Sequence, residues 1–139
     1  MKVNTYIHGS SEQSDEALWI ALGPYLCSRE VGKELGSPIY SIPGTRWFIA
    51  YDDDNRVIGF ASMRITPSAV WYDYAYVEST ERGKGVFTAM SVLRDFEAGL
   101  QSLPTRAVIR EKRWNRYKER GWEISSKRGS WINIIREIP

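Results

Sequence analysis

The sequence has one cysteine, one histidine and no long apolar run, and each scarcity excludes a class of protein. Cys27 cannot form a disulfide within the chain, and with His8 alone it cannot supply a zinc site of cysteine and histidine ligands. No stretch approaches the roughly 18 uncharged apolar residues of a membrane-spanning helix. No apolar segment follows Lys2, so the first residues do not resemble a secretory signal. We therefore expect a reducing, cytoplasmic setting and no contact with a membrane.

The chain does contain enough apolar material for a core. Its 139 residues are 42% hydrophobic and 26% charged, which fits a single globular domain over residues 1–139. Charge is divided unevenly, because residues 1–102 carry a net charge of −4 and residues 103–139 carry +6. The basic segment can steer an anionic ligand or a nucleic acid, or it can be an ordinary solvated surface.

Hydrophobic periodicity and turn residues predict seven strands and about four helices. Alternating, β-branched or aromatic segments indicate strands over residues 2–8, 47–51, 56–65, 69–78, 106–110, 122–126 and 131–138, with Lys127–Ser130 as the last turn. Helical spacing predicts a helix that is capped by Ser14, divided at Gly23–Pro24 and ended by Gly36. Further helices are expected over 86–100 and 111–120. A hairpin meander before one strand–helix–strand crossover predicts a mixed α/β sheet that is not doubly wound.

The most informative segment is V-E-S-T-E-R-G-K-G-V-F-T, residues 77–88, which joins the long aromatic strand to the amphipathic helix. Gly83 and Gly85 allow a sharp turn with no Cβ in the way of a ligand. Free N–H groups at the helix N-terminus suit a pyrophosphate, and Arg82 and Lys84 add positive charge. The segment lacks the spacing of a Walker loop and the third glycine of a dinucleotide fingerprint, where Thr88 stands. The alternative to a pyrophosphate site is a strand-to-helix turn that requires two glycines for its backbone conformation and binds no ligand.

Two short motifs resemble the GCN5-related N-acetyltransferase (GNAT) superfamily. Its signature has Gln or Arg first, glycine fourth and Gly or Ala sixth, and R-G-K-G-V-F at residues 82–87 fits it except at Phe87. The family's second motif is a short helix that ends in Tyr, three variable residues, Gly and Phe. Y-K-E-R-G-W at residues 117–122 fits this motif, with Trp in place of Phe. The resemblance covers residues 47–138. It implies a single-domain, mixed but mostly antiparallel twisted sheet of about seven strands, flanked by about four helices, with a splay between strands 4 and 5.

The resemblance also implies an activity, namely transfer of an acetyl group from acetyl-coenzyme A to a primary amine of a small molecule or peptide. The backbone near Val77 would hold the pantetheine arm, and residues 82–88 would hold the pyrophosphate. The expected cofactor-binding residues are Val77, Arg82, Gly83, Lys84, Gly85, Val86, Phe87 and Thr88. Phe87 departs from the family by placing a bulky ring where a small residue lets the cofactor approach, and Arg110 stands where the family often has Asn.

Two residues are candidates for catalysis. Tyr117 matches the family's tyrosine that protonates the leaving thiolate, a task that suits a hydroxyl still protonated at neutral pH; a core aromatic is the alternative. Asp73 is the candidate general base, because its aromatic neighbours would desolvate the carboxylate. It would share a strand face with Trp71, Ala75 and Val77 unless a bulge breaks the register. An exposed carboxylate or an arginine partner is the alternative for Asp73, and Glu78 is the second choice as base.

Two other functions keep the same fold. The basic segment could hold a nucleic acid, with the amine belonging to a DNA base or an aminoacyl-tRNA, through Arg110, Lys112, Arg113, Arg116 and Arg120. Alternatively, the chain could be a non-catalytic nucleic-acid-binding or adaptor domain, which Phe87 and Arg110 favour.

The sequence also leaves homodimerisation open. It identifies no metal site: Asp52, Asp53 and Asp54 lack the spacing and glycine of a calcium loop and fit a hairpin turn.

Overall fold

The computed structural model describes residues 1–138, which form a seven-stranded sheet with the order β1-β2-β3-β4-β5-β7-β6. Every neighbouring pair is antiparallel except β4 and β5, which are parallel. The predicted mixed, mostly antiparallel sheet is therefore confirmed. The strands are β1 (Lys2–Ile7), β2 (Arg46–Tyr51), β3 (Val57–Ile65), β4 (Val70–Val77), β5 (Thr105–Arg110), β6 (Glu123–Arg128) and β7 (Trp131–Arg136).

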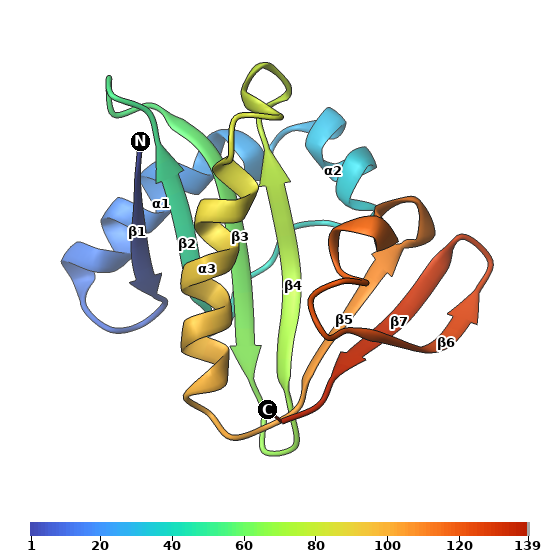
Figure 1. Ribbon diagram of the computed structural model, residues 1–139. Coiled ribbons are helices and arrows are strands. Elements are labelled where there is room, and N and C mark those ends of the chain that lie inside the picture. Colours follow the sequence, from blue (N-terminus) through green and yellow to red (C-terminus); the bar gives the residue numbers. More distant parts are fainter. Residues whose placement is uncertain (139) are drawn as a thin grey trace.

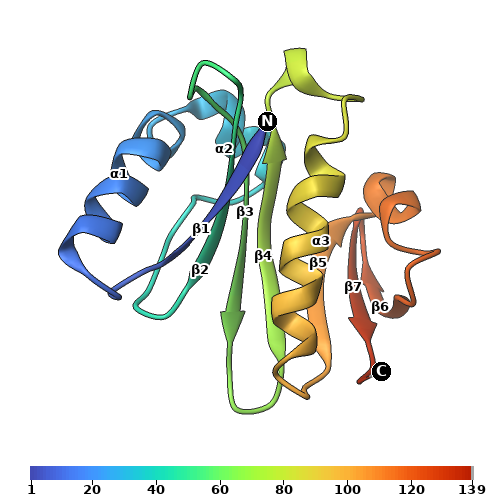
Figure 2. The same cartoon turned by 60° about the vertical axis from the view of Figure 1, so that its left-hand side comes forward.

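Helices cover both faces of the sheet (Figures 1 and 2). Helices α1 (Glu12–Leu26) and α2 (Arg29–Leu35) pack on one face, and α3 (Val86–Gly99) packs on the other. Each interface has its own apolar core, because strand side chains alternate between the faces. Two 3-10 helices complete the fold, η1 (Ser79–Glu81) after β4 and η2 (Glu111–Arg116) after β5. Among residues 1–138, no helix has the length and apolarity needed to cross a membrane.

Two details of the first helices differ from the prediction. The N-cap is Ser11, whose hydroxyl accepts a hydrogen bond from the Ser14 N–H, so Ser14 lies inside the first turn. The helix also continues through Gly23–Pro24 to Leu26. Proline removes the hydrogen bond to the carbonyl four residues earlier, that of Ile20. The Ile20 side chain is exposed, so water can replace the missing donor on that side of the helix. Gly36 ends α2 in the left-handed conformation, as predicted.

The last part of the chain is also built from tighter turns than the sequence suggested. The helix expected over 111–120 is a 3-10 helix over Glu111–Arg116 followed by turns. Strand β6 extends to Arg128, so the turn to β7 consists of Gly129 and Ser130 rather than Lys127–Ser130. Gly129 has a φ of 62°, which glycine adopts without strain in such two-residue hairpin turns.

Strands β4 and β5 separate after a short paired segment, and this splay is the main feature that positions the site. They pair only over residues 70–72 of β4 and 105–107 of β5, although β4 continues to Val77 and β5 to Arg110. Figure 1 shows the two strands diverging toward the loop that precedes α3. On its other edge, β4 bulges where its register against β3 shifts, so that Asp73 and Tyr74 together oppose Ser62. The predicted splay and the suspected bulge are both present.

Candidate functional site

The glycine loop encloses a cavity at the start of α3. Gly83 and Gly85 have φ values of 78° and 85°, which bend the chain sharply between η1 and the helix. Within residues 1–138, none of the N–H groups of residues 83–88 donates a hydrogen bond, and no side chain caps the helix. The cavity measures about 340 Å³ and is lined by Val77, Glu81, Arg82, Gly83, Gly85, Val86, Phe87, Thr88 and Arg116, so two arginines outnumber one carboxylate. Free amides around such a space form a favourable anion site.

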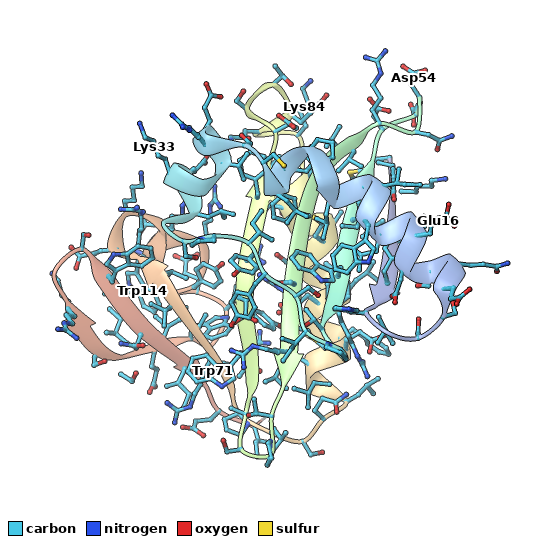
Figure 3. The ribbon with its side chains drawn as sticks, turned by 180° about the vertical axis from the view of Figure 1, so that it is seen from behind. Glu16, Lys33, Asp54, Trp71, Lys84 and Trp114 are labelled. Carbon is cyan, nitrogen blue, oxygen red and sulfur yellow. The ribbon has the colours of Figure 1, made fainter. Side chains whose placement is uncertain are left out.

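The two basic residues of the loop have different positions. The Arg82 Nε donates to the Val77 carbonyl at 2.9 Å, and its Nη2 donates to Glu34 at 2.6 Å, so its side chain stays against the cavity. Lys84 does not line the cavity; its ammonium group lies 3.2 Å from Glu81, and its side chain is 63% exposed. Figure 3 shows Lys84 at the outer tip of the loop. Arg82 is therefore better placed than Lys84 to contact a bound anion.

Phe87 forms part of the wall of the cavity. Its ring packs edge-on against Tyr117, with the ring centroids 6.2 Å apart. The Arg116 guanidinium lies 4.9 Å from the Phe87 ring centroid, and Arg116 lines the same cavity. Partial desolvation and the neighbouring positive charge of Arg113 lower the pKa of Arg116. The Phe87 ring therefore packs against the Arg116 guanidinium, and both side chains line the loop cavity.

A glycine that the sequence analysis did not single out lets α3 approach the sheet. A Cβ at Gly59 in β3 would lie 2.9 Å from the Tyr76 carbonyl oxygen and 3.2 Å from side-chain atoms of both Val86 and Met90. A larger residue would clash with the backbone of β4 and press on two side chains of α3, so the helix could not pack this close to the sheet. Gly59 therefore helps to set the distance between the glycine loop and β4. An isolated glycine within a predicted strand was the available signal.

The splay contains a second, smaller cavity of about 60 Å³. Tyr117 lines it and is only 8% exposed. Within residues 1–138 its hydroxyl makes no hydrogen bond, while its ring is held between Phe87 and Trp122. Beyond Tyr72, the backbone of β4 has no β5 partner on this side. An extended chain could therefore pair with β4 and bring a reactive group close to Tyr117.

Arg94 is a buried residue that the sequence analysis missed. It lies on α3 with 2% of its surface exposed and lines the splay cavity. Its Nη1 donates to the carbonyls of Ser62 at 3.3 Å and Tyr74 at 3.0 Å, two residues of the bulge. Its guanidinium lies 3.9 Å from the centroid of the Tyr72 ring, and no carboxylate within residues 1–138 forms an ion pair with it. The arginine thus holds the bulge in place. The available signal was a charged residue four positions after Met90, on the apolar stripe of the helix.

Asp73 has an arginine partner in the structure. The Arg64 Nε donates to its Oδ2 at 2.8 Å, and the Arg64 Nη2 donates to its Oδ1 at 3.1 Å. The bulge changes the register that simple alternation predicts for Asp73. Both residues line a third cavity of about 400 Å³, the aromatic pocket. Its other lining residues are Leu35, Ser37, Tyr40, Trp71, Tyr72, Tyr74, Val108 and Trp131.

Glu78, the second choice as base, accepts a hydrogen bond from the Tyr25 hydroxyl at 2.7 Å. Burial and this carboxylate raise the pKa of Tyr25 above its ordinary value. Glu78 lines none of the three cavities described above.

The basic residues after β5 divide into two sets. Arg110, Arg113 and Arg116 line the splay cavity, and Arg113 donates to Glu34 at 2.9 Å. Desolvation alone would raise the pKa of Glu34, but hydrogen bonds from Arg82 and Arg113 outweigh it and hold that pKa below its usual range. Lys112 and Arg120 are exposed and line neither the splay nor the loop cavity. Within residues 1–138, no group of three or more His, Cys, Asp and Glu side chains could hold a metal ion.

Comparison with known proteins gives a clear result for structure only. No protein-family model matches the sequence, and no curated protein sequence is significantly similar. Among solved structures, Escherichia coli ElaA is similar with a TM-score of 0.79 and 15% identity, covering 99% of this chain and 100% of ElaA. An aminoglycoside 6'-N-acetyltransferase complexed with coenzyme A has a TM-score of 0.67 and 12% identity, covering 100% of this chain and 98% of that one.

A third similar structure is the PaiA N-acetyltransferase of Thermoplasma acidophilum in complex with coenzyme A. Its TM-score is 0.59 at 14% identity, and the match covers 99% of each chain. At such low identities the likeness concerns the fold. The chain has the GNAT fold, as the motifs at residues 82–87 and 117–122 led us to expect.

Proposed function

We propose that this chain transfers an acetyl group from acetyl-coenzyme A to a primary amine. One observation carries the proposal: a loop of free amides and a splayed strand edge meet at Tyr117. Arg116 lines both the loop cavity and the splay cavity, and Phe87 in the loop wall contacts Tyr117. A cofactor with a pyrophosphate at one end and a thioester at the other matches this arrangement. Two proteins of the same fold have been solved with coenzyme A, which supports the choice.

The cofactor would be held mainly by backbone groups. The amides of residues 83–88 would donate to the pyrophosphate, with charge supplied by Arg82 and Arg116. The unpaired edge of β4 between the bulge and Val77 would hydrogen-bond the pantetheine arm. A backbone N–H on that edge would also polarise the thioester carbonyl, since such donors stabilise the oxyanion that develops during acyl transfer. Holding both reactants in the splay supplies much of the rate by orientation.

Proton transfers would complete the reaction. Asp73 would take a proton from the ammonium group of the acceptor as Arg64 releases part of its contact with the carboxylate. The amine nitrogen then bonds to the thioester carbon, the carbon–sulfur bond breaks, and the Tyr117 hydroxyl gives its proton to the departing thiolate. The nitrogen loses its second proton as the amide forms, and that proton restores the Tyr117 hydroxyl through solvent. The arginines around the splay cavity also disfavour an ammonium ion through like-charge repulsion, which eases deprotonation of the acceptor.

Cofactor binding gives the first test of this function. Coenzyme A at about 100 times its Kd should stabilise the protein by about 2.7 kcal/mol, giving a clear rise in Tm by scanning fluorimetry. The Gly85→Ala variant should lose most of that rise, because the φ of 85° disfavours any residue with a side chain, so alanine would shift the loop and its amides. Gly129→Ala is the matched control, as it places alanine at another positive φ, 62°, in the β6–β7 turn. If coenzyme A leaves the wild-type Tm unchanged, the proposed function is wrong.

A nucleic-acid substrate is the second candidate, and the charge of residues 103–139 is its support. The orientation of the arginines favours it less, since Arg110, Arg113 and Arg116 line the splay cavity. Lys112 and Arg120 are exposed members of the predicted set that line neither the splay cavity nor the loop cavity. We expect no salt-sensitive gel shift with tRNA or duplex DNA at physiological ionic strength. A shift that weakens steeply with salt and is lost in Lys112→Ala/Arg120→Ala would instead favour the nucleic-acid function.

A further inference from the structure

The aromatic pocket adjoins the splay cavity on the face of the sheet that α2 covers. The two cavities share lining residues, among them Tyr72, Asp73 and Trp131, so a molecule in the pocket can reach the place where the thioester would lie. Figure 3 looks onto this face and shows Trp71 at the start of β4, near the strands of the last hairpin. The pocket has the position required of an acceptor site for the proposed function.

The walls of the pocket are fixed by packing. An added Cβ on Gly36, at the end of α2, would lie 2.5 Å from the Trp131 ring, so the two are in close contact. Arg110 lies over the same ring, 4.6 Å from its centroid. The Tyr74 hydroxyl donates to the Pro38 carbonyl at 2.8 Å and accepts from the Tyr40 N–H at 3.3 Å. A pocket of preformed aromatic walls selects a ligand with a large apolar or aromatic body.

The polar groups of the pocket add a second requirement. Arg64 and Asp73 form the charged pair in its lining, and the Arg64 Nη1 donates no hydrogen bond within residues 1–138. A carboxylate beside Arg64 would therefore find a guanidinium with donors to spare, and an ammonium beside Asp73 would find an acceptor. A ligand that carries both groups next to each other is complementary to this pair.

The charge around both cavities favours an acceptor that includes an anion. Together they are lined by five arginines, at positions 64, 94, 110, 113 and 116, against the two carboxylates of Glu34 and Asp73. The resulting net charge of +3 repels polyamines and other multiply cationic amines. It attracts a zwitterion whose carboxylate can approach the arginines.

Building on the proposed function, we infer that the acceptor is a free α-amino acid with an aromatic or large apolar side chain. Arg64 binds the carboxylate, the side chain packs between Trp71 and Trp131, and the amine faces the splay cavity. Asp73 removes one proton from the ammonium group; the new carbon–nitrogen bond then replaces the carbon–sulfur bond of the thioester. The products are an N-acetyl amino acid and coenzyme A, whose thiol receives the Tyr117 proton. The second proton that the nitrogen loses restores the Tyr117 hydroxyl through solvent, and Asp73 releases its proton to solvent.

Pairs of acceptors that differ only in the carboxylate test this inference. Initial rates of thiol release from acetyl-coenzyme A would be measured with phenylalanine against phenethylamine and with tryptophan against tryptamine. A hydrogen-bonded charge pair to Arg64 should give the amino acid an about 10- to 100-fold higher kcat/KM than its decarboxylated partner. The Arg64→Met variant should lose this preference and still bind coenzyme A. Arg56→Met, at an exposed arginine beside the β2–β3 turn, should keep it.

The outcomes separate the inference from the proposed function. If coenzyme A binds but wild-type protein uses the decarboxylated amines as well or better, or uses neither acceptor, the amino-acid inference is wrong and the cofactor site stands. If Arg64→Met keeps the preference, the carboxylate is bound elsewhere and the inference is also wrong. If coenzyme A does not bind at all, the proposed function fails and the inference fails with it.

Discussion

Replacing Tyr117 with phenylalanine is expected to lower kcat by about 100-fold or more, the usual contribution of a positioned general acid. The hydroxyl is the only group removed, and within residues 1–138 it makes no hydrogen bond that supports the fold. The phenylalanine ring would keep its packing against Phe87 and Trp122. Because the change removes an interaction made with the leaving thiolate, the Kd of coenzyme A, measured by calorimetry, should stay the same.

A tyrosine far from the cavities provides the control for this experiment. The Tyr6 hydroxyl lies 2.8 Å from that of Tyr51, at the β1–β2 edge of the sheet, so Tyr6→Phe removes a hydroxyl of the same kind without touching the site. Its kcat should match that of the wild type. Unchanged turnover in Tyr117→Phe, in protein that still binds coenzyme A, would show that another group or water protonates the thiolate.

The second large effect is expected at Arg94. Arg94→Met keeps much of the apolar volume but leaves the carbonyls of Ser62 and Tyr74 without their arginine donor at a buried position. An unsatisfied buried group costs about 1–3 kcal/mol, so the variant should lose about 2–4 kcal/mol of unfolding free energy. The bulge that Arg94 holds should also relax, so acetyl transfer should fall even under conditions where the variant is fully folded. Urea denaturation and rates measured below the transition would show both effects.

Replacing an exposed arginine is the control for Arg94→Met, because it removes a positive charge without removing buried hydrogen bonds. Arg128 is exposed at the end of β6, so Arg128→Met removes the same charge and should change stability by no more than about 0.5 kcal/mol. If Arg94→Met is as stable as Arg128→Met, water or a neighbouring group satisfies the two carbonyls. The assignment of Arg94 as the residue that holds the bulge would then be wrong.

The parts of the site that follow from local sequence were the ones that could be predicted. The bend at Gly83 and Gly85 and the helix that begins at Val86 depend on neighbouring residues only, so a short motif was enough to locate the loop cavity. The splay came with the fold that the motif indicated. Strand boundaries were close as well, because aromatic and β-branched segments mark them directly.

The parts that depend on distant residues could not be predicted. Nothing in the sequence shows that Arg64 and Asp73, on adjacent strands, form an ion pair, because the bulge that aligns them changes the register. The burial of Arg94 depends on carbonyls supplied by β3 and β4. The contact between Phe87 and Tyr117 joins segments that lie on opposite sides of β5 in sequence. This contact explains why the Phe87 ring forms part of the wall of the loop cavity.

The most direct test of the account is amide NMR of the ¹⁵N-labelled protein titrated with coenzyme A. If the free N–H groups at the start of α3 hold the pyrophosphate, the largest shifts will fall on residues 83–88, with smaller ones along β4 toward Val77. The titration should saturate at one cofactor per chain. Saturable binding whose shifts lie elsewhere, with the signals of residues 83–88 unmoved, would contradict the central claim.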